Sequence, residues 1–137
     1  MKTTFKAFNE AIEEMYYNDG KLLGYHITSK RNIKSIMRNG LVPHVPEDYD
    51  ENGDMNGVYF FKTEQDARDA LGQWFGDRIE EIEEETGRAY NEVCLEVDLT
   101  GLEYYLVDSV EYEWIYVSDI DEPEPISPDR ILRVFPI

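Results

Sequence analysis

The chain has 137 residues, of which 42% are hydrophobic and 13% aromatic, and its formal net charge is −17. This length and apolar content predict a single folded domain over residues 1–137 and argue against intrinsic disorder. So strong a negative charge repels nucleic-acid phosphates and anionic membranes, which disfavours a nucleic-acid-binding role and favours basic protein partners.

The only cysteine, Cys94, excludes an internal disulfide and lies in an apolar stretch, where we expect a buried, inert thiol. The N-terminal residues lack the apolar segment of a secretory signal. No apolar run reaches the ~20 residues needed to cross a bilayer. These features predict a cytoplasmic protein without a membrane association.

Two helices are predicted before residue 44. Apolar residues at helical spacing predict an amphipathic helix at about 3–18, as an extension that precedes a core at about 22–137. The next helix is predicted over 33–37, and the pair Asn39-Gly40 ends it.

A longer helix is predicted after residue 63. Thr63, with Asp66 three residues later, forms a variant of the capping box that begins this helix. Its apolar stripe continues to Ile82 with the spacing of one helical face. Gly72 and Gly76 each cost about 1 kcal/mol relative to alanine, so they indicate a break or a close contact within the helix.

Strands dominate the last third of the chain. Val93, Leu95 and Val97 alternate with acidic residues, which is the period of a half-buried strand. Further strands are predicted from their β-branched and aromatic residues, at 22–27, 57–61, 102–107, 112–117 and 131–135. Helices and strands are segregated along the chain, which predicts the α+β class rather than βαβ repeats.

Two polar segments, 44–56 and 119–129, are predicted to be loops. Residues 48–56 match the first part of a calcium-binding EF-hand loop. The twelfth position would be Tyr59 in place of the bidentate glutamate, and a strand follows instead of a helix. We therefore expect a turn-rich loop beside the substrate and no metal site.

Three predicted strand segments each carry one polar group of a different kind. These are the imidazole of His26, the phenol ring of Tyr59 and the carboxylate of Glu113. Each has an ordinary structural interpretation as well: a core histidine, an aromatic core residue and a solvent-facing glutamate. Phosphate-binding loops of the Walker and Rossmann types are absent from the sequence.

In this order, the segments Tyr-His-Ile-Thr (25–28), Gly-Val-Tyr-Phe-Phe (57–61) and Glu-Tyr-Glu-Trp-Ile (111–115) resemble the His-Tyr-Glu constellation of the ADP-ribosyltransferase superfamily. The similarity is to its small bacterial and phage members and covers most of the chain from residue 24 onward. It implies a split β-sheet fold, with helices packed on the N-terminal half. It also implies an enzyme that uses NAD as its substrate and transfers ADP-ribose to a macromolecule, for which we expect a basic protein.

The same resemblance assigns roles to individual residues. It implies that Tyr25, His26 and Thr28 contact NAD, that Tyr59 stacks on the nicotinamide, and that Glu113 is the catalytic carboxylate. A carboxylate suits this chemistry, because cleavage of the nicotinamide–ribose bond passes through a transition state with oxocarbenium character. It can also orient or deprotonate an acceptor group.

The sequence departs from the family pattern at two points. Glu111, which we expect as a second catalytic residue beside Glu113, completes a Glu-x-Glu that resembles the one in arginine-modifying members, in which the first glutamate engages the acceptor. That branch has arginine where His26 stands, so the acceptor stays open. Some branches also stack a second ring from the helix after the tyrosine strand. Here Trp74 or Phe75 would serve only if the helix turned inward, and we expect core packing instead.

Other functions fit parts of the sequence. A non-catalytic acidic protein that binds and blocks a basic surface would need no NAD. An NAD hydrolase and an RNA 2′-phosphotransferase share the fold of the proposed family. The phosphotransferase relies on several arginines, and Arg31, Arg38, Arg68 and Arg78 are not on the strands expected to carry them.

Overall fold

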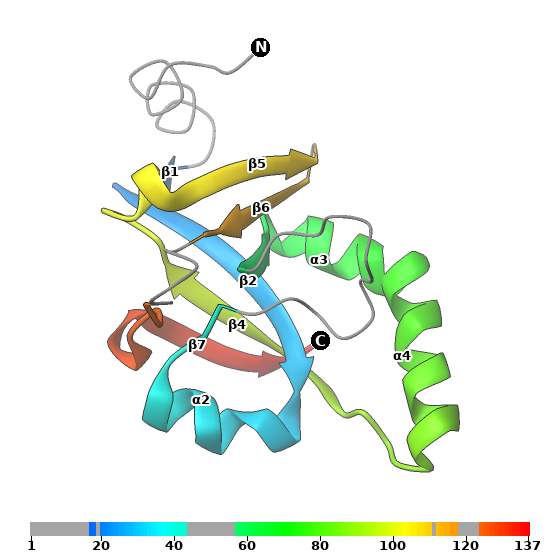
Figure 1. Ribbon diagram of the computed structural model, residues 1–137. Coiled ribbons are helices and arrows are strands. Elements are labelled where there is room, and N and C mark those ends of the chain that lie inside the picture. Colours follow the sequence, from blue (N-terminus) through cyan, green and yellow to red (C-terminus); the bar gives the residue numbers. More distant parts are fainter. Residues whose placement is uncertain (1–16, 19, 44–56, 111, 118–123) are drawn as a thin grey trace.

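An antiparallel sheet organises the described part of the chain, which comprises residues 17–18, 20–43, 57–110, 112–117 and 124–137 of this computed structural model (Figure 1). The strand order is β5-β6-β3-β2-β4-β7, and β1 pairs with the start of β2. The bounds are β1 (Tyr17–Asn18), β2 (Lys21–Ser29), β3 (Val58–Phe61), β4 (Glu92–Asp98), β5 (Leu106–Val110), β6 (Glu113–Tyr116) and β7 (Ile131–Pro136).

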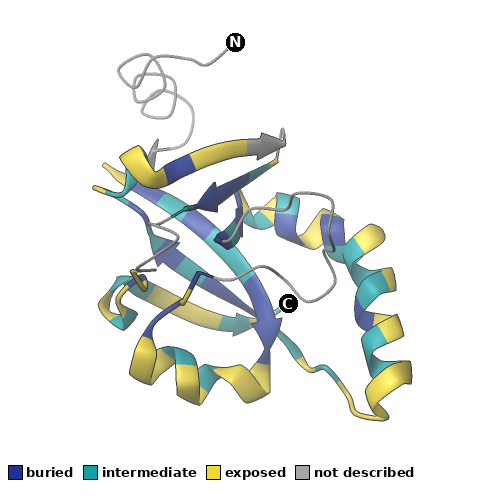
Figure 2. Ribbon diagram, in the orientation of Figure 1, coloured by how far each residue is buried: buried dark blue, intermediate teal, exposed yellow. Residues whose placement is uncertain are grey.

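Both faces of the sheet are covered. On one face Phe60, Leu95 and Trp114 belong to the larger apolar cluster and are at most 1% exposed. On the other face a smaller cluster includes Ile27 and Cys94, which pack with alanines of a helix. Figure 2 shows the central strands as the most buried part of the molecule. Period-two alternation therefore sends successive side chains of β4 into two separate cores.

The sheet nearly divides between β2 and β3. β2 pairs with β4 from Leu23 to Ser29, but its registered pairing with β3 is limited to Tyr25 and Phe61. β3 in turn pairs along its whole length with β6. The sheet thus consists of two well-paired parts, joined at one point.

The helices are η1 (Lys30–Asn32), α2 (Ile33–Asn39), α3 (Glu64–Leu71) and α4 (Trp74–Thr86). Boundary residues begin α3 and end α2 and α4. The backbone N–H of Asp66 donates to the Thr63 hydroxyl oxygen at 3.0 Å, which confirms the predicted cap of α3. Gly87 ends α4 in the left-handed conformation, with a φ of 68°. Figure 1 shows α3 beside the central strands, α4 continuing from it at the right of the view, and α2 near β7.

The predicted long helix is wrong in one respect, because the chain breaks it after Leu71 into α3 and α4. A Cβ atom at Gly76 would lie 2.0 Å from the carbonyl oxygen of Leu71. The break between α3 and α4 is therefore compatible only with glycine at position 76. Gly76 is one of the two glycines that indicated a break or a close contact.

Two further expectations are corrected. Residues Glu103–Tyr105 form a 3-10 turn (η2), so the strand predicted from residue 102 begins only at Leu106. Tyr17–Asn18, at the end of the helix predicted at 3–18, belong to β1, while residues 1–16 lie outside the described part. The described end of the predicted 119–129 loop contains a bridge from Ile126 to Leu41 and the turn η3 (Pro128–Arg130).

The mixed α+β class is confirmed. The described α-helices all lie between residues 33 and 86, and most strands follow them, as the sequence predicted. None of the helices in the described ranges is long and apolar enough to traverse a bilayer.

Candidate functional site

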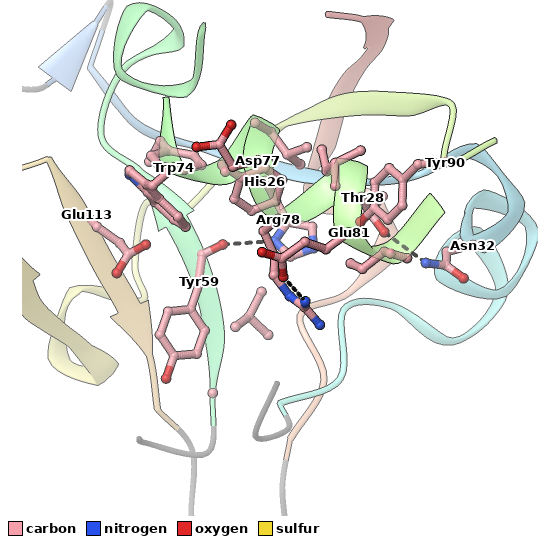
Figure 3. A pocket seen from close by; sticks show the side chains of 17 residues that line it. His26, Thr28, Asn32, Tyr59, Trp74, Asp77, Arg78, Glu81, Tyr90 and Glu113 are labelled. Atoms are coloured by element: carbon pink, nitrogen blue, oxygen red, sulfur yellow. Dashed lines mark hydrogen bonds and ion pairs between the residues drawn. The ribbon is translucent and has the colours of Figure 1, made fainter. Parts of the chain in front are cut away.

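A cleft of about 730 Å³ lies between β2, β3, the start of β6 and α4. Its volume falls within the roughly 300–1,000 Å³ of small-molecule sites. It occupies the part of the sheet where β2 and β3 have ceased to pair. The lining includes polar and aromatic side chains from several elements (Figure 3), among them His26, Thr28, Asn32, Tyr59, Trp74, Phe75, Asp77, Arg78, Glu81, Tyr90 and Glu113.

His26 bridges the division of the sheet. Its Nδ1 atom lies 2.8 Å from the main-chain oxygen of Tyr59. Because a carbonyl oxygen can only accept, Nδ1 must carry the proton and donate. The imidazole also lies against Phe60, with ring centroids 5.8 Å apart. The His26 side chain thus supplies a hydrogen bond between β2 and β3 at a point where these strands have no registered backbone pair. This bond also fixes the position of the imidazole.

Tyr59 and Glu113 share one face of the β3–β6 pair. Phe61 is directly opposite Glu113, and Tyr59 is opposite Ile115, so Tyr59 and Glu113 are diagonal neighbours. Such neighbours are typically about 7–8 Å apart. Figure 3 shows the phenol ring and the carboxylate together at one end of the cleft. Gly57 permits this close strand packing, since a Cβ there would meet the carbonyl oxygen of Tyr116 at 2.5 Å.

Aromatic rings form a wall of the cleft near Glu113. Trp74 and Phe75 are at the start of α4, with ring centroids 5.3 Å apart, and each lies within 6.3 Å of the Phe61 ring. Phe75 also packs against the smaller apolar cluster, whereas Trp74 is 38% exposed. We expected both rings to serve only core packing. The break after Leu71 instead turns the start of α4 toward the cleft, so that both rings line it.

The opposite end of the cleft is more polar. The side-chain amide of Asn32 donates to the Thr28 hydroxyl oxygen at 3.0 Å. The Ser29 hydroxyl donates to the main-chain oxygen of Tyr90 at 2.6 Å, which ties the segment after α4 to the end of β2. The Thr28 hydroxyl and the Asn32 amide therefore line this end of the cleft in a fixed arrangement, and such polar groups suit a polar ligand.

Acidic groups outnumber basic ones in the lining. Asp77, Glu81 and Glu113 contribute carboxylates, and Arg78 is the one arginine or lysine among the described lining residues. Arg78 Nη1 is 2.6 Å from a carboxylate oxygen of Glu81, one turn later in α4. Arg78 therefore reaches the cleft already partly neutralised.

The structure brings together four of the six predicted site residues: His26, Thr28, Tyr59 and Glu113. Glu111 lies outside the described residues.

Tyr25 does not line the cleft. Its hydroxyl donates to a Glu96 carboxylate oxygen at 3.0 Å, and the same oxygen is 3.1 Å from Arg133. Burial, followed by this contact with Glu96, raises the pKa of Tyr25 above its usual value. Tyr25 therefore belongs to a polar network beside the smaller cluster.

Sequence reasoning missed several lining residues of α4 and its surroundings, namely Asn32, Asp77, Arg78, Glu81 and Tyr90. The helical spacing of Trp74, Arg78 and Glu81 was a usable signal, because these positions fall on one side of a helix.

Other predicted features bear less on the cleft. Cys94 is fully buried, and desolvation raises the pKa of its thiol to about 12, in agreement with the expected inert cysteine. Within the described ranges, no group of three or more His, Cys, Asp or Glu side chains is arranged to hold a metal ion. The segment that resembles part of an EF-hand, 48–56, lies outside those ranges.

Comparison with known proteins gave no match: no family model, no curated protein and no solved structure matches this chain.

Proposed function

We propose that this chain is an NAD-dependent ADP-ribosyltransferase that transfers ADP-ribose to a protein acceptor, with Glu113 as the catalytic carboxylate. One observation carries the proposal. His26, Tyr59 and Glu113 come from three different strands, and all three line one cleft.

The cleft offers suitable surfaces for the parts of NAD that react. The Tyr59 and Trp74 rings provide flat faces on which the nicotinamide can stack. His26 can hydrogen-bond to an oxygen of the reacting ribose, and the Thr28 hydroxyl, which lines the same cleft, can bind a polar group elsewhere on the dinucleotide. The near-division of the sheet between β2 and β3 also supports the expected split-sheet fold.

The proposed reaction breaks the bond between the nicotinamide nitrogen and C1′ of the ribose. The electron pair of that bond goes to the nicotinamide, which leaves as a neutral molecule. Glu113 accepts a hydrogen bond from a ribose hydroxyl and offsets the positive charge that develops on the sugar. The acceptor then forms the new bond to C1′ and loses a proton, and Glu113 is placed to receive it.

The overall charge favours a basic acceptor. With 30 acidic and 13 basic residues, the protein attracts positively charged surfaces at long range. Several carboxylates on α4, including those of Glu80, Glu84 and Glu85, are exposed. This supports a basic protein as the target and argues against a nucleic acid.

The test is incubation of the purified protein with NAD labelled in its ADP-ribose part and a whole-cell lysate. The wild type is compared with Glu113→Gln and with a matched control, Glu92→Gln, whose side chain is on β4 and does not line the cleft. We expect labelled protein bands with the wild type and the control, and none with Glu113→Gln. Equal labelling by all three would remove Glu113 from the chemistry.

The same exposed carboxylates support a second candidate, a non-catalytic acidic protein that occupies a basic surface. It predicts no labelling and no effect of NAD on the melting temperature. An NAD hydrolase would release nicotinamide without labelling any band. The 2′-phosphotransferase has less support, because that activity relies on several arginines. Only one of the four arginines considered lines the described cleft, namely Arg78, whereas Arg31, Arg38 and Arg68 do not.

A further inference from the structure

The cleft has two chemically different ends with an arginine between them. The aromatic and carboxylate end contains Tyr59, Trp74 and Glu113, and the polar end contains Thr28 and Asn32. In Figure 3, Arg78 and Glu81 lie between these ends, close to His26 in the view. A ligand that spans both ends of the cleft can therefore contact Arg78 between them.

The charge balance makes Arg78 decisive for an anionic ligand. Three carboxylates line the cleft, and Arg78 is its one arginine or lysine in the described part of the chain. Carboxylates repel a phosphate-bearing ligand, so such a ligand needs a cation at close range. An arginine meets this need well, because its planar guanidinium can bind phosphate oxygens through two parallel hydrogen bonds.

The ion pair between Arg78 and Glu81 is partly exposed to solvent. The Arg78 side chain is 30% exposed and that of Glu81 is 62% exposed. Exposed ion pairs contribute little net stability, because water solvates both groups when they separate. Glu81 can therefore release the guanidinium to a stronger anion at small cost.

We propose that Arg78 anchors the diphosphate of the ligand in the middle of the cleft, and that Glu81 competes with the ligand for this guanidinium. This inference rests on the proposed function in naming NAD as the ligand. It orients the dinucleotide, with the nicotinamide at the Tyr59 and Glu113 end and the adenosine toward Thr28 and Asn32. It makes Arg78 a binding residue, with no part in bond cleavage.

The experiment measures the dissociation constant of ADP-ribose by titration calorimetry for the wild type, Arg78→Gln and Glu81→Gln. ADP-ribose retains the diphosphate and lacks the scissile bond. The matched controls are Arg88→Gln and Glu84→Gln, whose side chains are exposed and do not line the cleft. Melting curves of all variants show that each is folded before titration.

We expect Arg78→Gln to weaken ADP-ribose binding roughly ten- to a hundredfold, the usual effect of losing a hydrogen bond to a charged group. Glu81→Gln should instead tighten binding severalfold, and both controls should bind like the wild type. Opposite changes in affinity for Arg78→Gln and Glu81→Gln are what competition between Glu81 and the ligand predicts. If Arg78→Gln binds normally, or if Glu81→Gln weakens binding as Arg78→Gln does, the inference is overturned.

A separate arm distinguishes this failure from failure of the proposed function. NAD binding and nicotinamide release that persist in Arg78→Gln at the wild-type level would overturn the inference alone. If wild-type protein binds neither NAD nor ADP-ribose, inorganic pyrophosphate becomes the probe. If pyrophosphate then binds in a way that depends on Arg78, the cleft has a diphosphate site but NAD is not its ligand. If pyrophosphate does not bind, both proposals are overturned.

Discussion

The Nδ1–H group of His26 donates to the main-chain oxygen of Tyr59, across a gap where β2 and β3 have no registered backbone pair. The pairing of these strands is limited to Tyr25 and Phe61, so continued pairing would have placed His26 opposite Phe60. The strands separate instead, and the imidazole occupies the opening. One hydrogen bond therefore joins His26 to Tyr59, two candidate NAD-contacting residues, at the place where β2 and β3 separate.

Loss of this hydrogen bond should destabilise the protein. In His26→Ala the carbonyl oxygen of Tyr59 loses its imidazole donor, and we expect the free energy of unfolding to fall by about 1–3 kcal/mol. Urea denaturation of the variant and the wild type measures the difference. An unchanged midpoint would show that the bond does not join the two parts of the sheet.

The two glycines near the helix break should respond oppositely to substitution by alanine. In Gly76→Ala the new Cβ would lie 2.0 Å from the Leu71 carbonyl oxygen, so we expect a loss of about 1–3 kcal/mol from overpacking. Gly72 has a φ of −77°, and its added Cβ would meet nothing closer than 3.5 Å.

Gly72→Ala is therefore the matched control. We expect a gain of about 0.4–1 kcal/mol, because alanine restricts the unfolded chain at a position compatible with its native backbone. Thermal unfolding of both variants gives the signs. Similar effects of the two substitutions would contradict the close contact at Gly76.

Trp74 should report ligand binding by fluorescence. Of the two tryptophans in the chain, Trp74 is 38% exposed and lines the cleft, whereas Trp114 is 1% exposed. We expect NAD to change the emission of the wild type through Trp74, and to leave the emission of Trp74→Phe unchanged. A change that persists in Trp74→Phe would place the ligand elsewhere.

Cys94 should make stability depend on alkaline pH. Burial raises the pKa of its thiol to about 12 in the folded protein, against 9.0 for the unperturbed group. The native state thus keeps this proton after the unfolded chain has lost it. The associated stability is fully present below pH 9 and decreases as the pH rises toward 12.

The expected decrease is up to about 1.4 kcal/mol per pH unit above the unfolded-state pKa. Urea denaturation at several pH values between 8 and 11, for the wild type and Cys94→Ala, isolates this contribution from other titrating groups. Parallel pH dependences of the two proteins would show that Cys94 makes no such contribution. The native thiol should also resist alkylation at pH 8 and react once the chain unfolds.

Local signals in the sequence predicted much of the fold. Thr63 at the start of α3 and Gly40 after α2 are boundary residues with a clear physical role, and both act as expected. The strand predicted from residue 102 was wrong because high β-propensity of tyrosine was given more weight than context. Tyr104 is 72% exposed in a 3-10 turn, so its side chain lacks the packing against neighbouring strands on which β-propensity depends.

The candidate site was only partly predictable. His26, Tyr59 and Glu113 could be found because each lies in a predicted strand whose neighbouring residues form a recognisable motif. Period-two alternation separates Tyr25 from His26, but it puts Tyr25, opposite Phe61, on the face that Tyr59 and Glu113 share. His26 lines the cleft where β2 and β3 no longer pair, which the alternation could not predict. Arg78 and Glu81 follow the break between α3 and α4, and they line the cleft. The two glycines indicated a break or a close contact, but not the direction that α4 takes after it.

The most direct test of a catalytic Glu113 is nicotinamide release from NAD, together with NAD binding, for the wild type and Glu113→Gln. We expect Glu113→Gln to retain the NAD-dependent rise in melting temperature and to release nicotinamide about 10²–10³ times more slowly, the usual cost of losing one group that stabilises transition-state charge. Equal rates in the two proteins, or no binding of NAD to the wild type, would contradict the proposed transferase.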